Sequence, residues 1–368
     1  MSKYLIISLL SFAMLFIACK KDKNKYDIPT SYNFQNVNYS GQTNRLAMLT
    51  ELGTYTKSAN ALNATALDAV KLKNMFNNVN NPFADTSLNS CGKMLADKTV
   101  STEAIIFEQL MDSLAAASAF TSNNSPSQEN PGVMTNGSGT KSYLVNANGV
   151  ELAQLIEKGL MGACFYYQAT AVYLGEGKMN VDNTSVIAGE GTAMEHHWDE
   201  AFGYLGVPLD FPVNKNGLLF WGKYLNDRES KIGQNATLMN AFLAGRAAIS
   251  NDNLGERDVK IMAIRRSWEQ VCVATAIAYL NDAIAAYAVD DAEKHHALSE
   301  AYAFIYSLKF GGDTTIPTTS ADVILASLGG TANLLQINFY NTTLSQIQNA
   351  KDALIAAFPS LAAVKDSL

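Results

Sequence analysis

The chain of 368 residues has only four cysteines. Outside the N-terminal segment these are Cys91, Cys164 and Cys272, an odd number without the close spacing of a zinc knuckle. Cys164 and Cys272 lie in apolar helical runs, which favours buried free thiols over a disulfide. Cys91 lies among Asn, Ser and Gly and could pair in an oxidising compartment, but the sequence indicates no partner. These spacings exclude a disulfide scaffold and a zinc knuckle.

Basic blocks and long apolar runs are also scarce. The chain has 27 Lys and Arg against 34 Asp and Glu, for a net charge of −7, and its one lysine-rich stretch is residues 20–25. An acidic chain of this kind is a poor nucleic-acid binder, so no nucleic-acid partner is expected. After residue 19 no apolar run is long enough to span a bilayer.

The N-terminus has the pattern of an export signal. Lys3 precedes an apolar stretch that closes with a small residue before Cys19, so residues 1–18 are predicted to be a lipoprotein signal peptide. The alternative is an uncleaved anchor. Cys19 would be the lipidated residue, and residues 19–40 would tether the body to a membrane. We expect an exported protein held to the cell envelope by lipid, at the outer membrane, on a face that the sequence does not choose.

Helical periodicity dominates the rest of the chain, and strand signals are almost absent. The pattern predicts an all-α fold of about ten helices. A first bundle is expected at about 41–120, a mobile seam at 121–142 and the remaining helices at 143–368, within one body from 41 to 368. Helices are expected near 43–58, 65–77, 101–120, 150–174, 190–205, 235–250, 254–288, 291–310, 321–328 and 344–357.

The four histidines form two adjacent pairs, each followed by a glutamate, an alanine and an aromatic residue. In the first pair His197 and His196 precede Glu200 by three and four residues, so both reach it on a helix. Imidazole beside carboxylate at this spacing is typical of metal ligation or of acid–base chemistry.

The second pair lies on the helix predicted near 291–310. Glu293, His296 and Glu300 recur at i, i+3 and i+7, which is one helical stripe. The two helices could be corresponding parts of a pseudo-symmetric pair of bundles, although a one-residue shift between them leaves that open. For any one histidine, a hydrogen-bonded structural role is the alternative. For the set, we expect His197, Glu200, His296 and Glu300 to share one polar site.

Other polar residues support this expectation. His196 and Glu293 would assist the shared site. Gln154 and Glu157 lie on the least polar predicted helix, where polar groups must find partners. Two interpretations stay open for them: hydrogen bonds to neighbouring helix ends, or an orientation toward the histidine helices. If a divalent metal binds, imidazole and carboxylate suit iron or zinc, and the sequence does not choose between them.

At these residues the chain resembles the imelysin-like superfamily of exported helical proteins. His197 and Glu200 match the His-x-x-Glu part of its Gly-x-His-x-x-Glu signature, although Glu195 stands where the glycine would be. More closely, residues 154–163, 194–208 and 296–308 look like a related helical lipoprotein family, a domain of unknown function. The resemblance covers most of 40–360 and implies two packed helical bundles. It also implies an envelope protein linked to iron uptake, with an envelope transport protein as partner and no established reaction.

Two other function classes compete. A metallopeptidase needs His-Glu-x-x-His or its inverse, and a serine hydrolase of the common elbow type needs Gly-x-Ser-x-Gly; neither motif occurs. A surface glycan-binding lipoprotein would need exposed aromatics such as Trp198, Trp221 and Trp268. Two of these tryptophans fall on predicted helices, where core packing is the simpler interpretation. We therefore expect a binding protein rather than an enzyme, with no residue assigned to catalysis.

Overall fold

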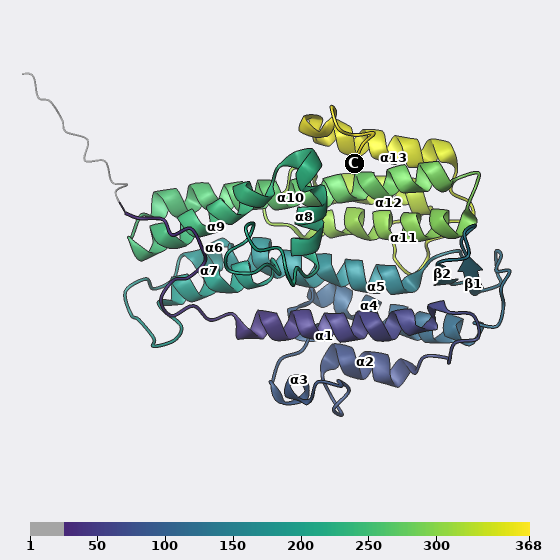
Figure 1. The fold of residues 1–368 in the computed structure, drawn as a ribbon, viewed down its shortest axis with the longest axis horizontal. Helices are drawn as coiled ribbons and strands as arrows, with labels where there is room; N and C mark the ends of the chain where they lie inside the picture. Colours follow the sequence, from purple (N-terminus) through teal and green to yellow (C-terminus); the bar gives the residue numbers. More distant parts are fainter. Residues whose placement is uncertain (1–25) are drawn as a thin grey trace, which may run out of the picture.

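A computed structural model describes residues 26–368, so the predicted signal peptide and Cys19 lie outside the described residues. The described part is an elongated all-α protein with one small hairpin, which confirms the predicted fold class (Figure 1). Its α-helices are α1 (Ser40–Lys57), α2 (Ala69–Asn77), α3 (Thr86–Ser90), α4 (Ser101–Ser118), α5 (Leu152–Leu160), α6 (Glu176–Met179), α7 (Ala193–Gly203), α8 (Trp221–Ile232), α9 (Asn235–Ser250), α10 (Leu254–Ala286), α11 (Asp291–Ser307), α12 (Thr318–Gly329) and α13 (Leu344–Ala357). None of these helices is long and apolar enough to cross a membrane.

A β-hairpin and five short or unusual helices complete the described chain. Strands β1 (Gly132–Thr135) and β2 (Ser142–Val145) pair antiparallel, with Val133 opposite Leu144. The range 121–142 was expected to be a mobile seam, but β1 lies inside it. The sequence did not indicate this strand, because a run of four residues is too short to show a clear alternation of polar and apolar positions. The remaining elements are η1 (Ser58–Asn60), η2 (Ala96–Lys98), the π-helix η3 (Met161–Tyr173), η4 (Leu308–Phe310) and η5 (Pro359–Leu361).

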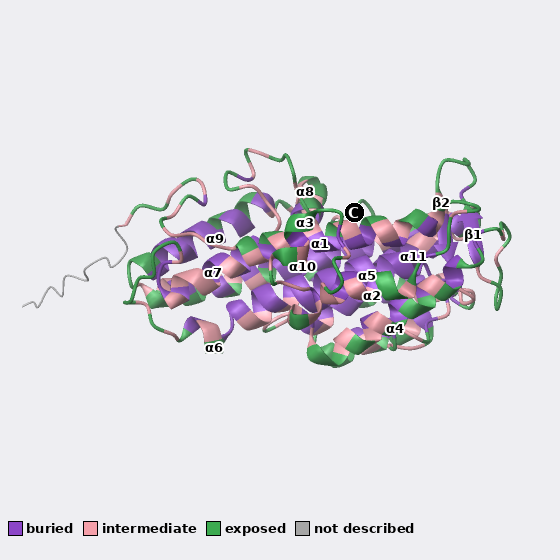
Figure 2. Cartoon of the chain, turned by 90° about the horizontal axis from the view of Figure 1, so that it is seen from below, coloured by how far each residue is buried: buried purple, intermediate pink, exposed green. Residues whose placement is uncertain are grey.

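The centre of the molecule is one buried rod made of α5 and η3. Every residue of α5 is buried, and η3 continues it with i→i−5 hydrogen bonds such as Leu174 N–H to the Ala169 carbonyl. Helices α1, α4 and α11 pack on α5, while α6, α7 and α11 pack on η3. Figure 2 shows this burial in the interior. A helix that is apolar all round must be surrounded by other elements, and the apolar helix predicted at 150–174 is surrounded in this way.

Helix α10 is the second long element. Its 33 residues make a rod of about 50 Å. It packs on α9, α11, α13 and α8, and in Figure 1 α9 lies beside one end and α11 beside the other. One continuous core of buried side chains joins the helices from α1 to α13. The two ends of the molecule therefore share α5–η3 and α10, and an internal duplication of the two ends stays a prediction.

All three tryptophans belong to this core. Trp198, Trp221 and Trp268 are at most 1% exposed, and the first two donate their indole N–H to the carbonyls of Phe242 and Met161. Because no tryptophan is available for stacking on a sugar ring, the glycan-binding alternative loses the residues on which it rested.

Candidate functional site

The first histidine pair lies on α7, whose start is fixed by a capping box between Thr192 and Glu195. We call His196, His197, Glu200 and Gln42 the α7 cluster. One oxygen of Glu200 accepts from Gln42 Nε2 at 3.0 Å, and the other lies 3.1 Å from His197 Nδ1. His196 Nε2 is 3.8 Å from the same oxygen. The predicted spacing is confirmed: both histidines reach Glu200. Both carboxylate oxygens of Glu200 already have protein partners.

Helix α7 carries a second polar network on its buried face. Arg246 from α9 pairs with Asp199 at 2.9 Å and with Glu195, and Tyr32 donates to Asp199 at 2.7 Å. Burial raises the pKa of Asp199 to about 7, against the opposing effect of Arg246. This network ties the segment before α1 to α7 and α9, which is a structural role.

The second histidine pair lies on α11, which begins at the N-cap Asp290. His296 Nδ1 is 2.6 Å from the carboxylate of Glu151, and its ring stacks on Tyr143 with centroids 4.3 Å apart. Tyr143 also donates its hydroxyl to Glu293 at 3.1 Å. The buried carboxylate of Glu151 therefore binds Nδ1 of His296, while Nε2 lies 3.8 Å from Glu300.

We call His296, Glu293, Glu300, Glu151, Tyr143 and Lys158 the α11 cluster. Among them, Glu300 is the residue whose hydrogen-bonding capacity is least satisfied. Its side chain is only 5% exposed, Lys158 Nζ lies 3.7 Å from Oε1, and Oε2 has no hydrogen-bond partner. Lys158 also pairs with Glu157, which binds Lys57 at 2.5 Å. Burial disfavours the charge on Glu157, but the two lysines outweigh burial and lower its pKa.

The polar residues of α5 reach α11 only through an intermediate residue, and Glu157 also binds Lys57 at the end of α1, so both interpretations stay open. Gln154 Nε2 donates to Glu151 at 3.3 Å, the residue that holds His296. Glu157 reaches Glu300 through Lys158. Both serve the α11 cluster and neither contacts the α7 cluster.

The expected single site is wrong, because the two clusters lie at opposite ends of the central rod. His296 contacts Glu151, just before α5, whereas the His197 ring packs near Tyr173, the last residue of η3. The nine residues of α5 and thirteen of η3 separate them by about 30 Å. In Figure 1, α7 and α11 occupy opposite halves of the molecule. Helical spacing on one element says nothing about which distant element it meets.

A cavity of about 670 Å³ opens at the α11 cluster. We call it the acidic cavity, because its charged lining consists of four carboxylates and two lysines: Asp282, Asp290, Glu293, Glu300, Lys141 and Lys223. His296 and the rings of Tyr224 and Tyr279 also line it. A pocket of this size suits a small organic molecule.

The titratable groups of the acidic cavity influence one another. Burial raises the pKa of Asp282, with Glu300 and Glu293 adding to the rise and Arg228 and His296 opposing it. Burial lowers the pKa of His296, but Glu151, Glu300 and Glu293 outweigh it, and the net pKa is raised. Its neighbour His295 points elsewhere: burial and Lys294 lower its pKa to about 4.

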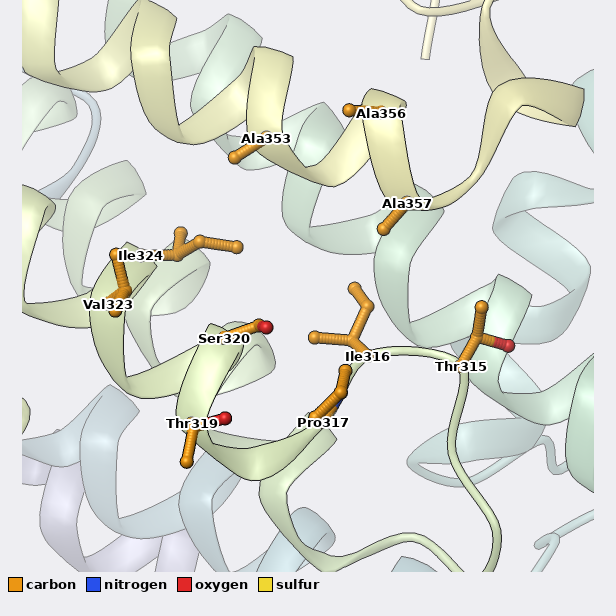
Figure 3. A pocket seen from close by; sticks show the side chains of 10 residues that line it. All are labelled: Thr315, Ile316, Pro317, Thr319, Ser320, Val323, Ile324, Ala353, Ala356 and Ala357. Carbon is orange, nitrogen blue, oxygen red and sulfur yellow. The ribbon is translucent and has the colours of Figure 1, made fainter.

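Two other arrangements offer less chemistry. Within residues 26–368 no group of three or more His, Cys, Asp or Glu is placed to hold a metal ion. An apolar cavity of about 480 Å³ lies between α12 and α13 (Figure 3). Side chains such as Ile316, Ile324 and Ala353 face it, and no charged residue lines it.

Sequence reasoning missed the residues that complete the α11 cluster. Glu151 lies 145 residues from His296 along the chain, and Tyr143 lies 150 from Glu293. Lys158 was also missed. One signal was available: Glu151 and Lys158 flank Gln154 and Glu157 on the least polar helix, where any charged residue needs a partner.

The comparisons with known proteins name no activity. No curated protein and no solved structure matches the chain. A family model described as "Domain of unknown function (DUF4856)" matches residues 29–351, which is most of the sequence. The chain therefore belongs to the DUF4856 family.

Proposed function

We propose that this protein binds a small molecule with a protonated amine in the acidic cavity. The observation that carries the proposal is Glu300, a buried carboxylate residue that lines the cavity and whose Oε2 has no hydrogen-bond partner. Leaving such an atom unpaired costs about 1–3 kcal/mol or more. An ammonium group supplies the missing donor and charge.

The surroundings of Glu300 favour a cation. Carboxylates outnumber lysines in the lining, and Glu151 behind His296 offsets the charge that the imidazole gains when protonated. The rings of Tyr224 and Tyr279 add faces that attract cations. The α7 cluster lacks this opportunity, because both oxygens of Glu200 are already bound.

A divalent metal, iron or zinc, is the second candidate. His296 Nε2 and Glu300 Oε2 are 3.8 Å apart, both residues line the cavity, and Glu151 orients the imidazole as metal-binding histidines require. Only two protein ligands converge there, so the metal would take its remaining ligands from water or from a bound molecule.

The cellular setting is part of the same proposal. The signal pattern before Cys19 supports lipid anchoring at the cell envelope, and the His-x-x-Glu match of His197 and Glu200 supports a distant imelysin-like relationship. A role in iron uptake with an envelope transport partner depends on the metal candidate. Labelling with an alkyne-bearing palmitate tests the anchor: the wild type takes up label, and Cys19→Ala does not. Label retained by Cys19→Ala would contradict it.

Binding is tested with pentylamine by isothermal titration of the folded body. Glu300→Gln should weaken binding at least tenfold, because it removes the charge that faces the ammonium. The matched control is Glu200→Gln on α7, which should leave affinity unchanged. Equal loss in both variants, or no binding by the wild type, would overturn the amine proposal. Separate titrations with Zn²⁺ and Fe²⁺ alone test the metal candidate, which requires uptake that His296→Asn abolishes.

A further inference from the structure

A separate cavity of about 600 Å³ lies along the segment that leads into α1. Residues 32–40 form most of its wall, α1 adds Thr43, and the loops before and after α7 add Gly189 and Leu209. In Figure 1 this segment is the dark purple chain before α1. We call it the neutral cavity, because none of the described residues that line it carries a charge. It shares no lining residue with the acidic cavity.

The wall of the neutral cavity is held in place by α7 and its flanking loops. Tyr32 N–H donates to the Leu209 carbonyl at 2.8 Å, and the Tyr32 ring stacks on Phe202 of α7. The Asn36 side chain accepts from Gly189 N–H at 3.0 Å. The cavity is therefore formed before any ligand arrives, and binding does not have to order its wall.

Three asparagines supply polar groups to this cavity: Asn33, Asn36 and Asn38. Asn38 Oδ1 accepts from the backbone N–H and the hydroxyl of Ser40, just as Asn36 Oδ1 accepts from a backbone N–H. Within residues 26–368 the Nδ2 groups of Asn36 and Asn38 have no hydrogen-bond partner, and neither does any side-chain atom of Asn33. Each amide nitrogen carries two donors. Because the oxygens of Asn36 and Asn38 are bound, the direction of their donors is fixed.

Aromatic rings form part of the apolar lining. Tyr32 is only 1% exposed, so its ring belongs to the core, whereas Phe34 and Tyr39 are half-buried. Tyr39 packs on Phe202 with the two rings nearly perpendicular and their centroids 5.7 Å apart. Phe34 and Tyr39 therefore keep part of their surface exposed where they line the cavity. An exposed aromatic ring packs well against a ligand that has an apolar face.

We propose that the neutral cavity binds an uncharged saccharide. The hydroxyl oxygens of the sugar accept from the unbound amide N–H groups of Asn36 and Asn38, and the C–H face of the sugar ring packs on Phe34 and Tyr39. An ionic ligand would find no counter-charge in the lining. The volume lies within the range of small-molecule pockets. The site uses none of the buried tryptophans and no residue of the acidic cavity, so it stands apart from the proposed function.

Affinity electrophoresis in native gels tests the inference. Separate gels contain dextran, laminarin, mannan or xylan, and a gel without polysaccharide gives the reference mobility. The full chain is kept in a polyoxyethylene detergent, which carries no sugar. We expect at least one of these polysaccharides to retard the protein. Isothermal titration with the oligosaccharide of that polymer then measures the affinity of the site.

Two nearly isosteric substitutions assign the binding to the neutral cavity. Asn36→Asp and Asn38→Asp keep the oxygen that accepts from the backbone and remove the N–H donors, and Asp tolerates the left-handed backbone of Asn36 (φ 58°). Each should weaken saccharide binding about fivefold, the usual effect of one lost hydrogen bond. Asn333→Asp is the matched control, because Asn333 Oδ1 also accepts from a backbone N–H, that of Leu335, and Asn333 lines neither cavity. It should leave the affinity unchanged.

Each outcome decides between the alternatives. Unchanged mobility in all four polysaccharide gels would overturn the saccharide site. Retardation that survives both Asn36→Asp and Asn38→Asp would overturn its assignment to the neutral cavity. Titration with the uncharged peptide acetyl-tetraalanine amide covers the other neutral ligand class, and tighter binding of this peptide than of every saccharide would also overturn the inference. Glu300→Gln should not change saccharide binding, so the amine proposal and this one can fail separately. Circular dichroism melting of each variant shows that lost affinity does not come from unfolding.

Discussion

The α7 and α11 clusters contain the same residue types at nearly the same spacing, yet only one of them is open. On α7, Glu200 is closed by Gln42 and His197. On α11, Glu300 faces the acidic cavity with one oxygen unpaired, and the carboxylate that holds His296 comes from another element, Glu151. The comparison shows that a histidine–glutamate spacing locates a polar helix face, while the partners brought by distant elements decide whether that face is occupied.

The largest difference between the clusters should appear when the carboxylates are removed. Glu151 is fully buried and accepts hydrogen bonds from Asn60, Gln154 and His296. Glu151→Leu should therefore lower the free energy of unfolding by about 3–5 kcal/mol. Glu200→Leu, in a partly exposed cluster, should cost about 1–2 kcal/mol. Urea unfolding measures both, and equal losses would show that the two clusters are energetically alike.

His295 on α11 should determine much of the stability that the protein loses at acid pH. His295 has a pKa of about 4 in the folded protein against 6.5 for the free side chain. Its neutral form is favoured on folding, so its contribution is present above pH 6.5 and is lost as pH falls toward 4. The shift corresponds to roughly 3 kcal/mol. In His295→Asn, the free energy of unfolding that is lost between pH 6.5 and pH 4 should be smaller by that amount. Urea unfolding at a series of pH values measures this loss, and an unchanged loss would contradict the assignment.

His296, its sequence neighbour, should act in the opposite direction. Its pKa is raised in the folded protein by Glu151, Glu300 and Glu293, which outweigh burial. Its contribution is therefore full below pH 6.5 and declines as pH rises through the folded pKa. His296→Gln should reduce the fall in the free energy of unfolding at alkaline pH and leave its fall at acid pH unchanged. NMR titration of the two imidazoles gives an independent measure, and a folded pKa of His296 below 6.5 would refute the prediction.

The smallest effect should be the same at both clusters. Thr192 caps α7 by accepting from Glu195 N–H, and Asp290 caps α11 by accepting from Glu293 N–H. Thr192→Ala and Asp290→Ala should each cost about 1 kcal/mol. Thermal unfolding of the two variants measures this. A much larger cost at one cap would mean that the clusters differ in their backbone as well as in their partners.

Periodicity in the sequence predicted the helices well because it reports local burial. The predicted ranges 235–250 and 344–357 coincide with α9 and α13, and the helix expected at 150–174 is the buried rod α5–η3. The π-type hydrogen bonding of η3 was not predicted, since it preserves the apolar pattern. The hairpin was missed because its strands are four residues long.

Partners across the fold could not be predicted from one sequence. Arg265 and Glu269 have the i, i+4 spacing of an ion pair, yet Arg265 donates to the carbonyls of Thr170 and Leu174. Glu269 instead accepts from the N–H groups of Thr315 and Ile316. The expected single histidine site failed for the same reason: each histidine helix meets a different end of the central rod of α5 and η3.

The rod of α5 and η3 has a consequence for any attempt to divide the protein. It is contributed by the first half of the sequence, yet α11, from the second half, packs along it, and Glu151 at its start receives hydrogen bonds from both halves. A fragment that ends before α8 would expose the apolar flank that α11 covers and would aggregate. Two co-expressed fragments cut within residues 207–220 would instead have to assemble into a non-covalent complex, and the acidic cavity would exist only after they do.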